Sequence, residues 1–345
     1  VCSLAGAAPS TAGLRSFDGG TGWLNSPPLS PAALAGKVVL VDFWEYTCIN
    51  CLKTLPYERA WYERYAKYGF TIVGVHTPEF AFSGEPANVA AAVKRLGVAW
   101  PVVIDSQHAI WDRYGNDAWP HELLFDQHGK LIADHEGEGD YPAMEQRIQQ
   151  ALRATNPDAR FPQPMDYLPQ DRYSKPGAVC YRHTQEMYVA NWRGDGVLGN
   201  EQGYAVGHAV DYVDPGGYQE GRAYLQGPWL QTGEAMVAAP GNAPEQHVAL
   251  RYRAIEVVAV LAPADHAQVP TFVTQDGVPL QRTDAGRDVH YDSRGRSYVV
   301  VDAPREYELV MNKHFGQHDL ELLPEHPGLG VYTFDFEACE VGADR

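Results

Sequence analysis

The stretch that decides the fold of this chain is Val38-Val39-Leu40-Val41-Asp42-Phe43-Trp44, followed after three residues by Cys48-Ile49-Asn50-Cys51. Its apolar run is typical of a strand that is buried on both faces of a sheet. The cysteines stand where this strand joins a predicted helix, whose free N–H groups and positive dipole end stabilise a thiolate on Cys48. Because a thiolate is the nucleophile of thiol–disulfide exchange, the pattern indicates a redox-active cysteine pair.

Strands and helices alternate around this stretch. The helix after the cysteines contains Pro56, which favours a kink. The turn signal Asp126-Gln127-His128-Gly129 joins two strands as a hairpin. This order predicts an α/β domain whose sheet carries helices on both faces. The expected strands are 37–44, 70–76, 101–104, 122–125 and 131–135, and the expected helices are 47–67, 85–96, 109–114 and 141–154.

The second half has a different pattern. Residues 156–178 are proline-rich and lack periodicity, which predicts a linker between a domain at 1–155, with an N-terminal extension, and a domain at 179–345. The latter contains short strand-like runs separated by turn signals, which predicts an all-β, jelly-roll-like sandwich. Its expected strands are 223–226, 247–252, 254–261, 271–274, 297–301, 307–311 and 332–336.

The chain is acidic: its 345 residues include 27 Lys and Arg against 44 Asp and Glu, a formal net charge of -17. This balance argues against nucleic acid and against an anionic membrane surface as partners. No stretch of about eighteen apolar residues is present, so we expect no membrane-spanning helix. The N-terminus lacks the regions of an intact signal peptide, which indicates a processed or a cloned end, with Cys2 as a candidate for lipid attachment.

The remaining cysteines are Cys180 and Cys339, near the two ends of the second half. They form either a structural disulfide between its first and last strands or two buried free thiols, and only geometry decides. For Cys48 and Cys51, a zinc site would need a second pair with suitable spacing, and a purely structural disulfide would constrain very little chain. We therefore expect no metal and no cofactor beyond the redox-active disulfide. A metal pair at positions 314 and 318 would need a helix that the pattern does not indicate.

These motifs resemble the thioredoxin superfamily. Asp42 stands six residues before Cys48, where the family has a buried acid, and Pro56 stands five residues after Cys51, where the family has a helix-kinking proline. Trp119-Pro120 precedes a predicted strand, where the family has a cis-proline. The resemblance implies a thioredoxin fold for the first domain and an attack by Cys48 that leaves a mixed disulfide, which Cys51 resolves.

The resemblance also implies a role for each flanking residue. Asp42 would exchange a proton with Cys51, helped by burial that raises its pKa. A cis Pro120 would leave the preceding backbone free to pair with an extended substrate, and Trp44 would shield the site. The alternatives are an Asp42 that is a satisfied buried acid, a trans Pro120 and a Trp44 that belongs to the core.

A narrower resemblance is to the extracytoplasmic region of DipZ-type thiol–disulfide interchange proteins. In that family a CcdA-like membrane electron carrier can be fused to a thioredoxin-like domain, which is followed by a β-sandwich resembling a carbohydrate-binding module. The resemblance implies a periplasmic or other extracytoplasmic location, protein thiols and disulfides as substrates, a CcdA/DsbD-type carrier as electron donor, and chemistry like that of cytochrome c biogenesis. Because the chain as given carries no membrane part, we expect either an excised domain of a longer, membrane-tethered protein or a free soluble relative. The matching segments are 44–51, 74–80, 119–122, 137–141, 184–188 and 225–229.

Further residues are expected to line the site, namely Tyr46, Asn50, Trp119 and Glu79. The expectation for Glu79 comes from reductases of cytochrome maturation, which use a glutamate near their disulfide. His121 stands where the family more usually has a small residue, and either tunes the disulfide, contacts substrate or is an incidental surface residue.

Three functions stay open at this point. The residues between the cysteines add no positive charge, and we favour a reductant over an oxidant. Tyr46-Thr47-Cys48 also resembles the approach to the reactive cysteine of a thiol-dependent peroxidase. A third hypothesis is a glycan-binding protein with an accessory redox domain, because sugar rings stack on exposed aromatic side chains. Trp192 is the ring that we expect to be exposed, whereas Trp229 is expected in the core.

Overall fold

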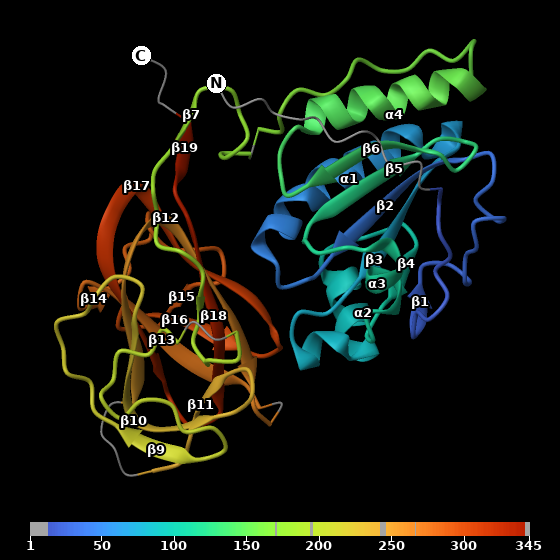
Figure 1. The fold of residues 1–345 in the computed structure, drawn as a ribbon. Coiled ribbons are helices and arrows are strands. Elements are labelled where there is room, and N and C mark those ends of the chain that lie inside the picture. The colour runs from blue at the N-terminus through green and yellow to red at the C-terminus, as the bar shows by residue number, and fades with distance from the viewer. Residues whose placement is uncertain (1–12, 170, 194–195, 242–245, 266, 342–345) are drawn as a thin grey trace, which may run out of the picture. The chain divides into compact units, whose positions relative to one another are not determined.

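The computed structural model describes residues 13–169, 171–193, 196–241, 246–265 and 267–341 (Figure 1). Cys2, the candidate for lipid attachment, lies outside these residues. The chain divides into two compact units, Val1–Ser174 and Lys175–Arg345. Each unit has a hydrophobic core of its own and is described separately below.

The first unit is built on one mixed sheet, in the order β1-β4-β3-β2-β5-β6 (Figure 1). The central strand β2 is buried at every position, pairs in parallel with β3 and pairs antiparallel with β5. The sequence predicted all of these strands except β1, a three-residue strand in the segment expected to be an extended lead-in. The strands are β1 (Gly22–Leu24), β2 (Val38–Trp44), β3 (Phe70–His76), β4 (Val102–Ile104), β5 (His121–Phe125) and β6 (Leu131–Glu136).

Helices cover both faces of this sheet, as predicted. Because side chains alternate along a strand, Leu40 and Trp44 of β2 belong to one core cluster, whereas Val41 and Phe43 belong to another. The first cluster includes residues of α1, α2 and α4, and the second includes Ile110 of α3. The helices are α1 (Ile49–Tyr65, with Pro56 inside it), α2 (Pro86–Arg95), α3 (Ala109–Tyr114) and α4 (Tyr141–Thr155), with short 3-10 turns at Ala66–Tyr68 and Ala81–Gly84.

Much of the segment predicted as a linker packs on the first unit. Phe161, Met165 and Leu168 lie against the core cluster that contains α1. The Tyr57 hydroxyl of α1 donates a hydrogen bond to the Asp171 carboxylate at 2.6 Å. Apolar side chains between the prolines thus find a surface to cover, and the compact unit extends to Ser174.

The second unit is all-β, as predicted, and its described strands include one continuous eleven-stranded sheet. Its two long strands explain this continuity: β12 pairs with β17 along most of its length, with β10 near its start and with β18 near its end. The two strands predicted at 247–252 and 254–261 are therefore one strand with an irregularity after Ala254. The strands are β8 (Met187–Tyr188), β9 (Ala209–Tyr212), β10 (Ala223–Gln231), β11 (Met236–Ala238), β12 (His247–Pro263), β13 (Val269–Gln275), β14 (Val278–Pro279), β15 (His290–Tyr291), β16 (Ser297–Val301), β17 (Arg305–Pro324) and β18 (Leu329–Glu337).

The second unit also contains a separate two-stranded sheet, formed by its first and last strands. This sheet consists of β7 (Ala178–Cys180) and β19 (Cys339–Val341), with Cys180 directly opposite Cys339. The two cysteines form a disulfide, with their Cα atoms 4.0 Å apart. The alternative of two buried free thiols is wrong, because strand pairing brings the residues together and Cys180 is exposed.

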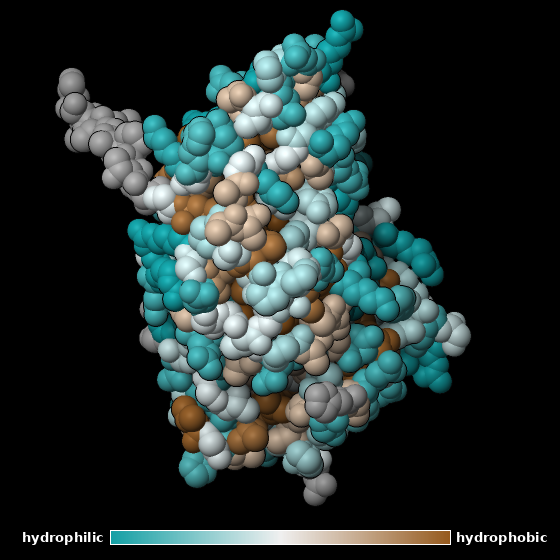
Figure 2. Space-filling model, turned by 90° about the vertical axis from the view of Figure 1, so that its right-hand side faces the viewer, coloured by the Kyte–Doolittle hydropathy of each residue, from teal (hydrophilic) through white to brown (hydrophobic). Residues whose placement is uncertain are grey.

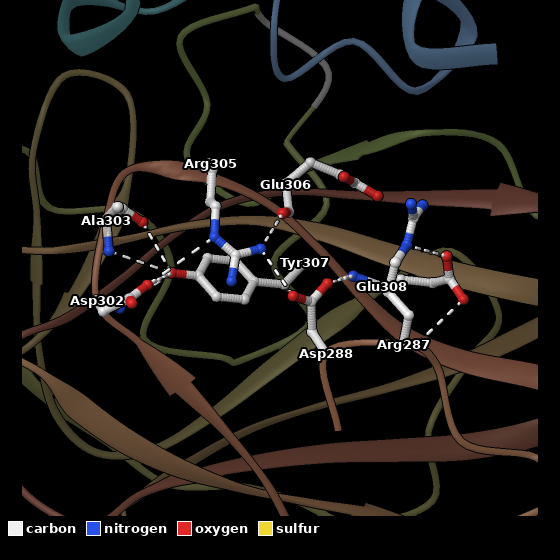
Figure 3. Close-up of polar contacts among 8 residues, drawn as sticks. All are labelled: Arg287, Asp288, Asp302, Ala303, Arg305, Glu306, Tyr307 and Glu308. Atoms are coloured by element: carbon white, nitrogen blue, oxygen red, sulfur yellow. Dashed lines mark hydrogen bonds and ion pairs between the residues drawn. The ribbon is translucent and has the colours of Figure 1, made fainter. Parts of the chain in front are cut away.

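Charged residues connect β17 to the segment before β15 (Figure 3). Arg305 forms an ion pair with Asp288 at 2.9 Å, and its guanidinium carbon lies 3.7 Å from the centre of the Tyr307 ring. Arg287 pairs with Glu308 at 2.7 Å. These contacts fix an irregular segment on the sheet. Positions 314 and 318 also lie on β17, so they do not have the helical arrangement that a metal pair would need.

Surface hydrophobicity differs between the units. Figure 2 shows one face on which hydrophilic residues are interspersed with small groups of hydrophobic ones. Among the described residues, the large hydrophobic side chains that are most exposed all belong to the second unit: Val179, Tyr181, Trp192, Val206, Val213 and Val278. They are scattered in sequence, and single exposed apolar residues are normal on protein surfaces.

Candidate active site

The two predicted redox cysteines meet at the start of α1. Cys48 caps the helix, and its sulfur accepts a hydrogen bond from the backbone N–H of Cys51 at 3.2 Å. The two residues form a disulfide, with their Cα atoms 5.3 Å apart. Cys51 is fully buried, whereas Cys48 is partly exposed. Cys48 is therefore the sulfur that a substrate can reach, and the N–H groups of the first helical turn stabilise negative charge on it.

A buried glutamate holds the loop that carries Cys48. The Glu45 carboxylate accepts hydrogen bonds from the backbone N–H and the hydroxyl of Thr47, and its backbone carbonyl accepts from the Cys48 N–H at 3.3 Å. His76 accepts a hydrogen bond from the Tyr46 N–H through Nε2 at 3.4 Å. Burial raises the pKa of Glu45 to about 7 and lowers the pKa of His76 to about 3. His76 is therefore a neutral acceptor, and its 3.8 Å approach to Glu45 is not an ion pair.

Aromatic rings support this loop from inside. The His76 ring stacks on Tyr46, with centroids 5.3 Å apart, and meets Trp44 edge-on at 5.2 Å. Both Trp44 and Tyr46 are buried, and they belong to the same core cluster as Cys51. Asn50, between the two cysteines, is half-buried.

Asp42 lies near the end of β2, on the face that α1 covers. It is fully buried, and residues 40 and 44 on the same face belong to the core cluster that contains Cys51. Burial raises the pKa of Asp42 to about 7, against an opposing contribution from Glu58 of α1. A carboxyl with a pKa in this range can exchange a proton with a thiol near neutral pH.

The peptide bond between Trp119 and Pro120 is cis, as the thioredoxin resemblance implies. It immediately precedes β5, and the Pro120 carbonyl accepts a hydrogen bond from the Gly137 N–H at 2.8 Å. Trp119 is half-buried and packs against Trp111, with ring centroids 4.4 Å apart.

His121, next to this proline, is a buried residue with two partners. Its Nδ1 is hydrogen-bonded to the Asn116 side chain, and its Nε2 lies 2.8 Å from the Asp134 carboxylate. His121, Asp134 and Glu136 each offer one potential metal-ligand atom, and these three atoms lie within 4.8 Å of one another. Both ring nitrogens of His121 are already engaged, however, so the arrangement is a hydrogen-bonded bridge between β5 and β6.

Two family models match this chain. Residues 24–152 match the family Redoxin, and residues 184–336 match the family Thioredoxin like C-terminal domain. The protein DipZ of Mycobacterium bovis is 31% identical over 332 residues, which cover 92% of this chain and 41% of that protein. The thiol-disulfide oxidoreductase YkuV of Bacillus subtilis is 25% identical over 133 residues, which cover 39% of this chain and 89% of that protein.

This chain thus combines a Redoxin-like region with a thioredoxin-like C-terminal region, and it is similar to known thiol-disulfide oxidoreductases. One solved structure of a thiol:disulfide interchange protein of the thioredoxin family from Chlorobium tepidum has 24% identity and a TM-score of 0.36, and covers 42% of this chain and 99% of its own. The chain spans 41% of the length of the DipZ relatives that it matches.

Several polar residues of this thioredoxin-like unit escaped the sequence analysis. Glu58 lies seven residues after Cys51, and Glu122 lies two residues before Leu124, a member of the α1-side core cluster. Helical and strand periodicity place both glutamates on the buried side, a signal that was available in the sequence. Glu45 gave no such signal, because a loop position has no periodicity. Its negative neighbour Glu79 contributes to the raised pKa of Glu45.

The second unit shows the two expected tryptophan environments. Trp192 is 38% exposed, whereas Trp229 is fully buried. The Arg193 guanidinium carbon lies 4.9 Å from the centre of the Trp192 ring and 4.6 Å from that of Tyr188. Among the described helices of both units, none is long and apolar enough to cross a lipid bilayer.

Proposed function

We propose that this protein is a thiol–disulfide oxidoreductase that works outside the cytoplasm and reduces disulfides of protein substrates, using electrons from a membrane carrier of the CcdA/DsbD type. The observation that carries the proposal is the asymmetry of the cysteine pair: Cys48 is accessible at the N-terminus of α1, and Cys51 is buried one helical turn further on. No cofactor beyond this disulfide is needed for the reaction.

In the reduced protein, the Cys48 thiolate attacks one sulfur of the substrate disulfide. A bond forms between Cys48 and that sulfur, the substrate S–S bond breaks, and the first substrate thiolate leaves. Cys51 then gives its proton to Asp42 and attacks the Cys48 sulfur. The second substrate thiolate leaves, and the Cys48–Cys51 disulfide is restored. Two electrons have passed to the substrate, and the membrane carrier returns them.

Similarity to DipZ supports the location and the electron donor, since it extends over both units of this chain. The electron direction rests on the dipeptide between the cysteines, Ile49-Asn50, which contributes no cationic group to stabilise the Cys48 thiolate further. A glycan ligand for the second unit stays a prediction, with the exposed Trp192 ring as its candidate contact.

The proposal is tested by titrating the Cys48–Cys51 pair against dithiothreitol and by measuring the reduction of insulin disulfides. We expect a reduction potential near about -270 mV rather than near about -120 mV, which is typical of an oxidant. We also expect Cys48→Ser to abolish insulin reduction. Unchanged reduction by Cys48→Ser would refute the assignment of the nucleophile, and an oxidant-like potential would reverse the proposed electron direction.

A further inference from the structure

Three buried carboxyl groups lie together behind the cysteine pair. Asp42 of β2 is directly opposite Glu122 of β5 in the antiparallel register, so their side chains share one face with Cβ atoms about 5 Å apart. Glu58 comes from α1, two helical turns after Cys51, and its carboxyl contacts that of Asp42. The three side chains come from three elements that also frame the cysteines.

These carboxyl groups are closed off from water and from other donors. Asp42 and Glu58 are 0% exposed, and Glu122 is 1% exposed. Within the described residues, no N–H or O–H group of another residue donates a hydrogen bond to any of their six carboxyl oxygens. The carboxyls of Asp42 and Glu58 are close enough to interact directly, and two ionised carboxylates buried side by side would repel each other strongly. At least one proton is therefore held between them.

The surrounding elements add little positive charge. Arg59 of α1 lowers the pKa of Glu58, but its guanidinium donates to the backbone carbonyls of Leu96 and Gly97. Gly74 of β3 is the neighbour of Asp42 on its other side and carries no charge. Titratable groups on the neighbouring elements include Cys51 of α1, His135 of β6, which is opposite Glu122, and Tyr141 of α4, whose pKa Glu122 helps to raise.

The proton belongs mainly to Glu58. Burial raises the pKa of Asp42 to about 7, and burial together with the Asp42 charge raises the pKa of Glu58 well above its usual value. The interaction between the two carboxyls raises the pKa of Glu58 and lowers the pKa of Asp42, which favours the proton on Glu58. Glu122 also stays neutral, because burial and the charge of Asp42, which lies opposite it, raise the pKa of Glu122 well above its usual value.

We propose that Glu58 is a positioning residue for thiol–disulfide exchange, whose carboxylic acid donates to Asp42 and keeps Asp42 in the ionised form that accepts the Cys51 proton. The inference rests on the proposed function, in which Cys51 must lose a proton before it attacks Cys48. The step balances: the thiol proton of Cys51 moves to Asp42, and Glu58 keeps its own proton throughout. When the cysteine pair is reduced again, Asp42 returns the proton to Cys51.

The test compares Glu58→Met with Glu58→Gln in the full chain. Methionine has nearly the same length and removes the donor, whereas glutamine keeps an N–H that can donate to Asp42. We measure, by rapid mixing, the pH dependence of the rate at which Cys51 resolves a mixed disulfide between Cys48 and a small thiol. For Glu58→Met we expect the midpoint of this profile to move up by at least one pH unit, with a rate about tenfold lower below the midpoint. Glu58→Gln should restore most of that shift.

Glu145→Met is the matched control. Glu145 is another fully buried glutamate of the same unit, but it accepts hydrogen bonds from the Tyr65 hydroxyl and the Met165 N–H instead of contacting Asp42. Its replacement removes the same group from the same unit and should leave the midpoint unchanged. A Glu58→Met profile that coincides with the wild-type profile, or a control that shifts equally, overturns the proposal.

A second measurement covers the case in which Glu58→Met does not fold. Infrared difference spectra of the wild type, recorded between the oxidised and reduced states near neutral pH, report the C=O bands of protonated carboxyl groups. We expect a protonated-carboxyl band that shifts on reduction and that Glu58→Gln removes. A spectrum without a band sensitive to Glu58→Gln overturns the proposal. Loss of insulin reduction by wild-type protein would instead refute the proposed function, since neither measurement here needs a protein substrate.

Discussion

Replacing Asp42 by Asn is expected to stabilise the first unit, and to do so more strongly as the pH rises. Asp42 is fully buried, and its pKa is raised from 3.8 to about 7 by burial. Between these two pH values the folded state binds the Asp42 proton and the unfolded state does not. By linkage, stability therefore falls as pH rises through this window, and the cost is complete above the folded-state pKa.

The size of this change in unfolding free energy follows from the shift in the pKa of Asp42. A difference of about three pH units corresponds to about 4 kcal/mol at 1.36 kcal/mol per unit, which is an upper estimate. Asparagine is never ionised and nearly isosteric, so Asp42→Asn avoids this cost but loses the proton shared with Glu58. We expect a gain of about 2 to 4 kcal/mol at pH 8 and a difference near zero at pH 4.

The assay is urea unfolding of the oxidised wild type and Asp42→Asn at pH 4, 6 and 8, followed by tryptophan fluorescence. Six of the eight tryptophans lie in the first unit, so the signal reports mainly on it. Glu145→Gln is the control, because that buried glutamate accepts hydrogen bonds from the Tyr65 hydroxyl and the Met165 N–H and does not contact Asp42. A stability difference that is independent of pH, or a loss of stability at pH 8, would refute the reasoning about Asp42.

Three further outcomes are expected. Replacing Cys180 and Cys339 together by Ala removes a cross-link that spans 159 residues, which should cost the second unit up to about 5 kcal/mol in urea unfolding; an unchanged midpoint would contradict a closed disulfide. The wild type should consume hydrogen peroxide negligibly, because the Thr47 hydroxyl donates to Glu45 and not to Cys48, and rapid, saturable consumption would instead favour the peroxidase hypothesis. Trp229→Ala should destabilise the second unit by about 3 to 5 kcal/mol, measured by calorimetry, because Trp229 is fully buried, whereas the 38% exposed Trp192 should tolerate the same change with a loss below about 1 kcal/mol.

Local pattern was enough to predict much of the first unit. The run before Cys48 is strand β2, and the helices at 85–96 and 109–114 match α2 and α3 to within a residue or two. Hydrophobic periodicity and turn residues act over a few positions, so they can be read directly. The same signals missed β1, whose three residues are too short for a period. They also divided β12 at Ala254, where the strand is irregular but continuous.

The chemistry of the site, like the fold, could be predicted from the sequence only in part. The spacing of Cys48 and Cys51 at a strand–helix joint, with Asp42 six residues earlier, was visible in the sequence and indicated disulfide exchange. Spacing alone does not show which charges meet once the chain folds. Only the register of β2 against β5 and the packing of α1 on the sheet bring Glu58 and Glu122 to Asp42.

The sequence by itself therefore determined the cysteine pair and its place at a strand–helix joint, on which the proposed reaction rests, since such a pair needs only a strand end, a helix start and three residues' separation. Tertiary structure alone decided that Cys180 and Cys339 are bonded, because their pairing joins positions 159 residues apart. It alone decided the state of the carboxyl groups behind Cys51. Protonation depends on the solvent that is excluded and on charges from other elements, and neither quantity exists until the sheet and α1 have closed over Asp42.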